Sequence, residues 1–274
     1  MTKLLNANFA RLWKTKSFWV CLILAFGVGL ANFLTSYSVQ PECAERLGAN
    51  MLSNSSNIMF FASIFAALFL GTDHSDGTIR NKLIVGHKRH NIYLSNLITT
   101  AAGGLLIMAV SWTVVLITGL CLGGKIGMPA GELALKMLIC IGAIIAISAV
   151  FTLLGTLLSS KSTIVAITLV STFVLLIGAA VIESLLDQPE YVQSYEMTVN
   201  GEVVQTDPQP NPMYIGGVKR EILKTVNDVL PSGQLMQMEM GLGRHAELMP
   251  LYSLGVLAAF TVVGASVFRK KDLK

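Results

Sequence analysis

The chain has few charged residues, and this excludes an ordinary soluble protein. Of its 274 residues only 13% are Asp, Glu, Lys or Arg, whereas 53% are hydrophobic. Soluble domains carry about 25% charged residues. The composition therefore indicates an integral membrane protein.

Cysteine is also scarce, with four in the whole chain. Cys21, Cys121 and Cys140 fall in apolar runs, and Cys43 falls between two of them. A disulfide between Cys43 and Cys121 is conceivable. Free thiols that pack as small apolar side chains are the better expectation.

Six apolar runs are long enough to cross a bilayer, which needs about 20 mostly apolar residues per helix. Each run must form a helix, because lipid offers no hydrogen-bond partner to a free backbone group. We therefore predict an all-α integral membrane protein with one transmembrane domain over residues 1–274. The predicted membrane helices are 18–39, 54–70, 97–122, 133–158, 163–184 and 249–268.

The predicted helices contain almost no charge, and this absence bears on function. Ion and proton pathways usually keep a charged residue deep in the membrane, whereas Lys136 and Glu183 lie near helix ends, within reach of the head groups. An ATP-independent secondary transporter or channel is therefore disfavoured, although it remains the alternative. A membrane-embedded enzyme or a non-transporting sensor has even less support, because no nucleophile or ligand cluster is visible. We expect no catalytic residue, cofactor or metal in this chain.

Basic residues are unevenly distributed, and the imbalance predicts orientation. Thirteen of the 20 Lys and Arg residues fall on the side that holds both termini. The positive-inside rule places that side in the cytoplasm. We expect a multi-pass protein of the cell membrane with both termini cytoplasmic. The thirteen are Lys3, Arg11, Lys14, Lys16, Arg80, Lys82, Lys88, Arg89, Lys161, Arg269, Lys270, Lys271 and Lys274.

The N-terminal segment 1–16, MTKLLNANFARLWKTK, combines apolar residues at helical spacing with basic residues. Such a helix lies along the membrane surface, with its basic side towards anionic head groups. We expect Phe9, Leu12 and Trp13 to contact the membrane interface.

The polar segment 71–96 separates the second and third predicted membrane helices. Ser75 or Asp76 can cap a helix start, and Gly86 can end it. The resulting helix of about ten residues is too short to be stable alone. It needs a surface to cover Ile79 and Leu83, which either the chain's own helices or a separate subunit can supply.

The stretch GTDHSDGTIRNKLIVGHKRHNIYLSNL resembles the cytoplasmic loop between helices 2 and 3 of ATP-binding-cassette (ABC) transporter permeases of the type-two export class. Those permeases carry an acidic residue, three variable positions and Gly-Thr, which Asp73, Gly77 and Thr78 match here. The acid is often Glu in that family. The resemblance covers the whole chain, and NPMYIGGVKREILKTVNDVLPSGQ resembles the outer segment of such permeases from Gram-positive bacteria.

The resemblance implies a function and partners. The loop would be a coupling helix that docks on a separate ABC ATPase, present in two copies, which would hold ATP and Mg. A second permease, identical or homologous, would complete a path for a peptide, antimicrobial or lipid-like substrate. No nucleic acid is expected. The implied ATPase-coupling residues are Asp73, Asp76, Gly77, Thr78, Ile79, Arg80, Lys82, Leu83, Lys88 and Arg89, with Ile79 and Leu83 as apolar anchors.

The segment 185–248 is long for a loop without structure of its own. Its alternating pattern around Asn200-Gly201 predicts a β-hairpin. Residues 218–230 have the spacing of an amphipathic helix, which Pro231 should end. We expect this segment to form an extracellular cap between the fifth and sixth membrane helices.

Overall fold

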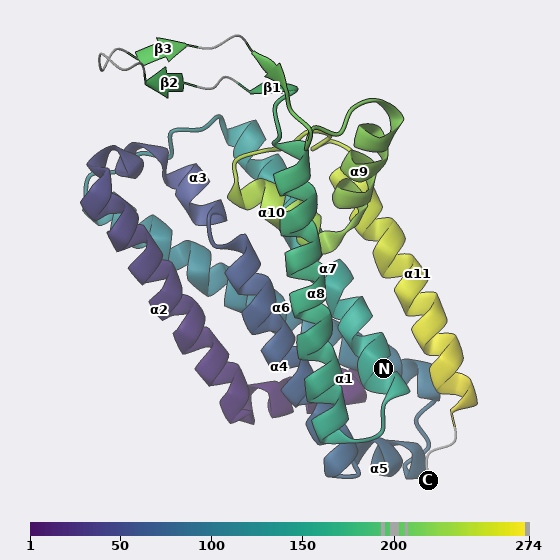
Figure 1. The fold of residues 1–274 in the computed structure, drawn as a ribbon. Coiled ribbons are helices and arrows are strands. Elements are labelled where there is room, and N and C mark those ends of the chain that lie inside the picture. Colours follow the sequence, from purple (N-terminus) through teal and green to yellow (C-terminus); the bar gives the residue numbers. More distant parts are fainter. Residues whose placement is uncertain (193–194, 198–202, 206–207, 272–274) are drawn as a thin grey trace.

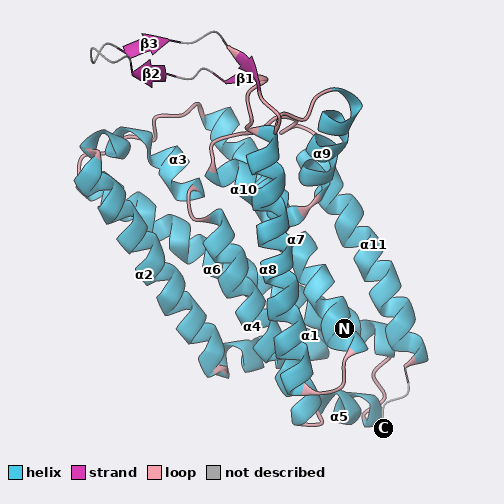
Figure 2. Cartoon of the chain, in the orientation of Figure 1, coloured by secondary structure: helices cyan, strands magenta, loops and turns pink. Residues whose placement is uncertain are grey.

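The computed structural model describes residues 1–192, 195–197, 203–205 and 208–271, and it is a helical bundle (Figures 1 and 2). Among these residues, six helices are long and apolar enough to cross a membrane, which confirms the predicted fold class. They are α2 (Lys16–Val39), α4 (Ser55–Ser75), α6 (Arg89–Cys121), α7 (Ala130–Leu157), α8 (Lys161–Leu186) and α11 (Met249–Lys270).

Two of these helices extend well beyond the apolar runs that predict them. Helix α4 continues past Leu70 to Ser75, and α6 begins at Arg89 rather than at Leu97. The first residue that interrupts α4 is Gly77, which has a positive φ of 65°. The loop predicted at 71–96 therefore shrinks to residues 76–88. Apolar length alone misses these turns, because a helix continues into polar sequence until a breaker stops it.

Two short helices lie at one end of the bundle, which we call the α5 end. They are α1 (Thr2–Lys14) and α5 (Thr78–Ile84), which lies between α4 and α6 in the chain. Figure 1 shows them beside the C-terminal end of α11. Thr15 has an extended backbone and separates α1 from α2.

The core runs the length of the bundle around α4 and α7, whereas α2, α8 and α11 expose most of their side chains. Phe65 and Phe69 of α4 and Phe151 of α7 are fully or almost fully buried. Close packing depends on glycine at one point, because a Cβ on Gly103 would lie 2.1 Å from the ring of Phe65. Small residues let membrane helices approach in this way.

The opposite end, which we call the hairpin end, carries the remaining elements. They are the 3₁₀ helix η1 (Pro41–Arg46), α3 (Leu47–Leu52), α9 (Gly217–Val229), α10 (Pro231–Glu239) and the short strands β1 (Tyr191–Val192), β2 (Tyr195–Met197), β3 (Val203–Gln205) and β4 (Gln209–Pro210). Strands β2 and β3 pair antiparallel, as do β1 and β4. The predicted turn at Asn200-Gly201 lies outside the described residues.

Proline sets several helix starts at the hairpin end. Proline fits the first turn of a helix, where its missing N–H costs no hydrogen bond. Pro231 accordingly ends α9 and starts α10 at once, and Pro250 lies in the first turn of α11. The four cysteines are free, so a disulfide between Cys43 and Cys121 does not form.

Candidate functional site

The α5 helix is held by glycine at both sides. Gly77, with a φ of 65°, precedes its first residue, and Gly86, with a φ of 89°, follows its last turn. Side chains other than glycine rarely adopt these left-handed angles. Seven of the eight residues between them, Thr78–Ile84, form the short helix that the sequence predicts, although it is shorter than the expected ten.

The apolar face of α5 packs on the chain's own helices. Ile79 is 5% exposed and belongs to a cluster with Tyr93 of α6 and Phe268 of α11, and Leu83 packs against the same cluster. This corrects the expectation that Ile79 and Leu83 are anchors for a partner. A seven-residue helix needs tertiary contacts to be stable, and α6 and α11 supply them.

A different part of α5 faces outward. Ile84 is 76% exposed and Val85 is 75% exposed, and Arg80 is exposed on the preceding turn. Exposed apolar side chains on a protein end that carries many charges are typical of a binding surface. Ile84 and Val85 are therefore apolar side chains at the α5 end that can contact a binding partner.

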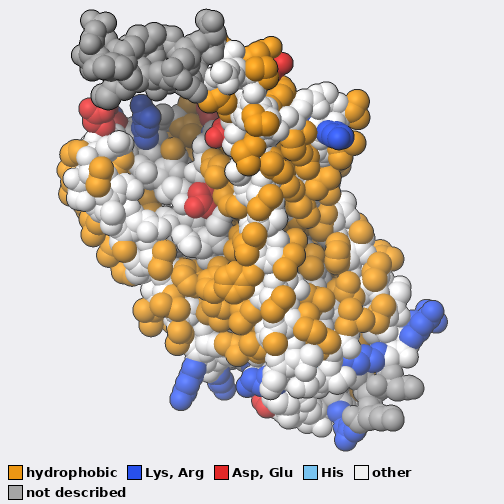
Figure 3. Space-filling model, viewed as in Figure 1, with side chains coloured by type: hydrophobic (Ala, Val, Ile, Leu, Met, Phe, Trp, Pro, Cys, Tyr) orange, Lys and Arg blue, Asp and Glu red, His pale blue; other side chains and the backbone are white. Residues whose placement is uncertain are grey.

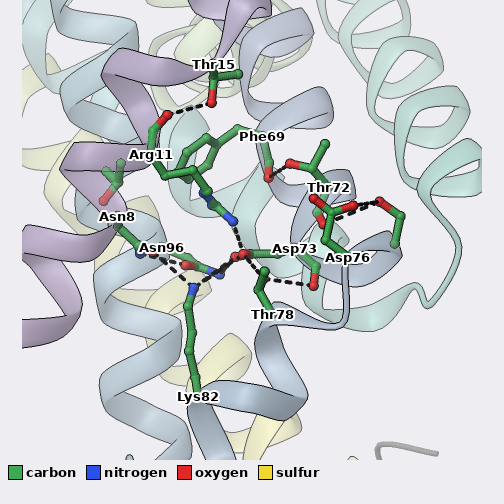
Figure 4. A network of polar contacts seen from close by, with 12 residues as sticks. Asn8, Arg11, Thr15, Phe69, Thr72, Asp73, Asp76, Thr78, Lys82 and Asn96 are labelled. Atoms are coloured by element: carbon green, nitrogen blue, oxygen red, sulfur yellow. Dashed lines mark hydrogen bonds and ion pairs between the residues drawn. The ribbon is translucent and has the colours of Figure 1, made fainter.

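Asp73 lies at the centre of the polar contacts between α5 and the neighbouring helices (Figure 4). Its carboxylate is fully buried and accepts hydrogen bonds from Asn96 Nδ2 at 2.9 Å and Thr78 Oγ1 at 2.5 Å. Lys82 Nζ lies 3.3 Å from both carboxylate oxygens, and the Arg11 guanidinium contacts Oδ1. We call Arg11, Asp73, Thr78, Lys82 and Asn96 the Asp73 cluster.

The Asp73 cluster joins four helices. Arg11 comes from α1, Asp73 from α4, Thr78 and Lys82 from α5, and Asn96 from α6. Asn8 of α1 extends the network, because it accepts from Lys82 Nζ at 3.0 Å and donates to Asn96 Oδ1 at 2.9 Å. All the described contacts of the Asp73 carboxylate are thus within its own chain, and its part in coupling to an ATPase stays a prediction. Asp73 fixes α5 to the membrane helices.

The cluster holds two cations against one carboxylate. Burial lowers the pKa of Arg11 to about 10, although the nearby charge of Asp76 opposes this. Burial, with a further effect of the Arg11 charge, lowers the pKa of Lys82 to about 7. The Arg11 guanidinium also lies over the Phe69 ring, 3.8 Å from its centroid, a cation–π contact. Because two cations share the one carboxylate of Asp73, loss of that carboxylate should destabilise the cluster.

The other predicted coupling residues have separate contacts. Asp76 is exposed and accepts from Ser75 Oγ at 2.9 Å, and Lys88 is exposed at the start of α6. Arg89, expected at the rim of a partner, donates to the carbonyl oxygens of Phe268 and Lys271 at the end of α11. Cations suit helix C-termini because of the helix dipole, so Arg89 serves the fold.

Lys271 was not among the candidate residues, yet it has a related role. Its Nζ donates to the carbonyl oxygens of Thr156 at 2.7 Å and Leu158 at 2.8 Å, at the end of α7. Burial lowers the pKa of Lys271 from its usual value. Arg89 and Lys271 together join the start of α6 and the ends of α7 and α11 into one unit at the α5 end.

The predicted interfacial residues of α1 divide into two groups. Leu12 is fully buried and Phe9 is half-buried, whereas Trp13 is 50% exposed. Leu4, Asn8 and Leu12, spaced four apart, form the buried face of α1. Leu12 therefore faces the protein core rather than lipid, because α1 packs on α6 and α2. Only Trp13 keeps the exposure that contact with a membrane surface requires.

A second polar cluster lies at the hairpin end. Arg244 forms a bidentate ion pair with Glu183, at 2.9 Å and 2.7 Å, and Asn227 donates to Glu183 at 2.6 Å. Asp228 binds His245 Nδ1 at 2.7 Å and Gln237 Nε2 at 2.8 Å. We call these six residues the Glu183 cluster. Glu183 is 2% exposed, so it does not reach the head groups as its place in the sequence suggested.

No His, Cys, Asp and Glu side chains among the described residues form a group of three or more that could hold a metal. The Asp73 cluster is saturated by cations, so it also offers no cation site. What the α5 end can do is bind through an exposed tip and transmit force through buried ion pairs.

Comparisons with known proteins then identify the kind of protein that carries this arrangement. Residues 4–179 match a family described as "ABC-2 family transporter protein", and this range covers α2, α4, α5, α6 and α7 and most of α1 and α8. A search of curated proteins finds no match.

Proposed function

Because the chain belongs to the ABC-2 family of transporter proteins, and is therefore a membrane component of an ABC transporter, we propose that it is the permease of an exporter driven by a separate ATPase chain. The observation that supports this most is the α5 tip, where Ile84 and Val85 are exposed while Ile79 and Leu83 pack α5 against the bundle. ATP hydrolysis, with ATP and Mg, belongs to that partner.

The ATPase docks on Arg80, Ile84 and Val85. Ile79, Leu83 and the Asp73 cluster then act inside the permease rather than at the interface. A push on α5 reaches α1, α4 and α6 together, because Asp73, Lys82 and Asn96 link these helices by short contacts. Helices packed this tightly move as units. The membrane helices thus tilt as the ATPase closes.

The distribution of charge supports an orientation in the cell membrane with both termini cytoplasmic. In Figure 3 most visible Lys and Arg side chains gather at the α5 end, whereas acidic side chains are more frequent towards the hairpin end. The positive-inside rule places the basic end in the cytoplasm, where an ATPase is available. The hairpin end then forms an extracellular cap.

A working transporter contains two ATPase copies and a second permease, identical or homologous. Apolar side chains exposed on α2 and α8, among them Val170, Phe173 and Val174, supply surface for lipid and for that second permease. Peptide, antimicrobial or lipid-like cargo suits a path lined by apolar and neutral polar groups. An ATP-independent secondary transporter or channel is the alternative.

Co-purification tests the coupling proposal. The chain would be expressed with a candidate ABC ATPase from its own genome, as wild type and as an Ile84→Asp, Val85→Asp double variant. Loss of two central apolar contacts should lower recovery of the ATPase at least about tenfold. Val39→Asp is the matched control, since Val39 is 73% exposed at the hairpin end. Equal recovery with the double variant would contradict docking at the α5 tip.

A further inference from the structure

Glu239, the last residue of α10, lies deep at the hairpin end without a cation. Its Oε2 accepts a hydrogen bond from the backbone N–H of Ser56, at 3.0 Å, in the first turn of α4. None of the ion pairs among the described residues includes Glu239. The side chain is half-buried, so part of it is open to a ligand.

The first turn of α4 is recessed into the bundle. Ser55 Oγ lies 3.7 Å from Sγ of Cys140, and Cys140 is ten residues beyond the start of α7 at Ala130. At 1.5 Å per residue, this level lies about 15 Å inside the hairpin end of α7. Gln234 of α10 also contacts Ser253, four residues into α11, at 2.6 Å. Glu239 is thus a carboxylate at the depth of the membrane helices.

The part of α2 next to the start of α4 carries polar side chains, although a membrane helix normally presents apolar groups. Asn32, Thr35 and Ser36 of α2 are exposed, and Asn32 Nδ2 donates to Asn54 Oδ1 at 2.5 Å. Figure 3 shows a recess between α2 and α8 in which few hydrophobic side chains are visible and which contains acidic atoms. Polar groups at membrane depth face the bundle interior, water or a ligand rather than lipid.

Unsatisfied polar atoms at the same helix start point to a ligand as well. Asn54, which is 1% exposed, has no partner for Nδ2, and Ser56 has none for Oγ among the described residues. Buried polar atoms are normally hydrogen-bonded, and a buried polar atom without a partner often marks a functional site.

An aromatic pair lies one helical turn deeper. Phe60 is four residues after Ser56 and therefore shares its face of α4. Its ring centroid is 5.4 Å from that of Phe173 in α8, and Phe173 is 50% exposed. A carboxylate above aromatic rings is the combination that recognises organic cations, by an ion pair and by cation–π attraction.

We propose that Glu239, together with Phe60 and Phe173, binds an ammonium or guanidinium group carried by an amphipathic peptide cargo. This inference rests on the proposed function, since it places the site on the path of an exporter. The carboxylate holds the cationic group at the hairpin end while the apolar part of the cargo contacts α4 and α8.

Direct binding tests the site. The full chain would be placed in nanodiscs of phosphatidylcholine, and its affinity measured for a fluorescent peptide of alternating leucine and lysine and for the same peptide with glutamine in place of lysine. The wild type should prefer the lysine peptide at least about tenfold, which one charge-assisted hydrogen bond can supply. Glu239→Gln should remove that preference. The amide oxygen still accepts the Ser56 N–H, so the variant separates charge from helix capping.

Two further variants keep the test decisive. Glu247→Gln changes an exposed carboxylate at the same end and should keep the preference, whereas Phe60→Leu should lower it several-fold through loss of cation–π attraction. The proposal is overturned if the wild type shows no preference, if Glu239→Gln retains it, or if Glu247→Gln loses it equally. Binding needs no ATPase, so failure here is distinct from failure of ATPase co-purification.

Discussion

The two ends of the bundle each contain a buried polar cluster, but the clusters differ in charge and in what they join. The Asp73 cluster places two cations on one carboxylate and links a surface helix, α5, to three others. The Glu183 cluster pairs Glu183 with Arg244 in a bidentate geometry, and it joins α9 to α8 through Asn227 and α10 to α9 through Gln237. The first suits transmission of movement, because α5 is short and its C-terminal tip is exposed. The second suits a fixed cap.

The largest effect should follow removal of the Asp73 charge. Asp73→Asn leaves Arg11 and Lys82 buried without a carboxylate, and breaking a buried ion pair on one side costs about 3–5 kcal/mol. Thermal unfolding in detergent should show this loss. The double variant Asp73→Asn, Lys82→Met should recover part of it, because one uncompensated cation is removed. Equal stability of Asp73→Asn and wild type would contradict the role of the cluster.

The Glu183 cluster should respond less. Glu183→Gln keeps the shape of the side chain but loses the ion pair with Arg244, which is 22% exposed and can regain water. We expect a loss of about 2 kcal/mol in the free energy of unfolding. Glu132→Gln, which removes an exposed pair with Lys136, should cost under about 1 kcal/mol. Similar losses in the two variants would show that the buried ion pair of Glu183 stabilises the fold no more than an exposed pair does.

The smallest effect concerns pH and should appear only at the α5 end. The pKa of Lys82 is lowered to about 7 from 10.5, so between these values the unfolded chain binds more protons than the folded chain. The free energy of unfolding should therefore rise with pH across this window. The rise should be smaller than burial alone would give, since the Asp73 carboxylate, 3.3 Å from Lys82 Nζ, favours the charged lysine.

Lys82→Met isolates that contribution from other titrating groups. The difference in unfolding free energy between wild type and Lys82→Met should change between pH 7 and 10, as wild type loses the cost of its buried charge. A difference that stays constant with pH would show that Lys82 does not titrate in this range.

Much of the fold was predictable because its signals are local. The apolar runs predicted all six long helices, and the spacing of residues 218–230 predicted α9 (Gly217–Val229) closely. The C-terminal end of α4 and the N-terminal end of α6 were not predicted, because both helices continue into polar sequence.

The candidate site was harder to predict, since its contacts are distant in the chain. Asp73 meets Arg11 from 62 residues away, and no local pattern indicates that pairing. The amphipathic spacing of Ile79 and Leu83 indicated a buried face, but not whether α6 and α11 or a separate subunit covers it. One signal of the polar network was present in the sequence. Asn8 lies four residues from both Leu4 and Leu12, so a polar side chain falls on the buried face of α1 and needs a hydrogen-bond partner there.

Site-specific photo-crosslinking tests the central claim most directly, namely that the exposed tip of α5 meets the ATPase. A photoreactive amino acid would replace Val85, and in a matched control Val39, which has nearly the same exposure at the hairpin end. Irradiation of the complex should join the Val85 variant to the ATPase chain and leave the Val39 variant unjoined. An ATPase crosslink from Val39 but not from Val85 would contradict both the docking surface and the orientation of the chain.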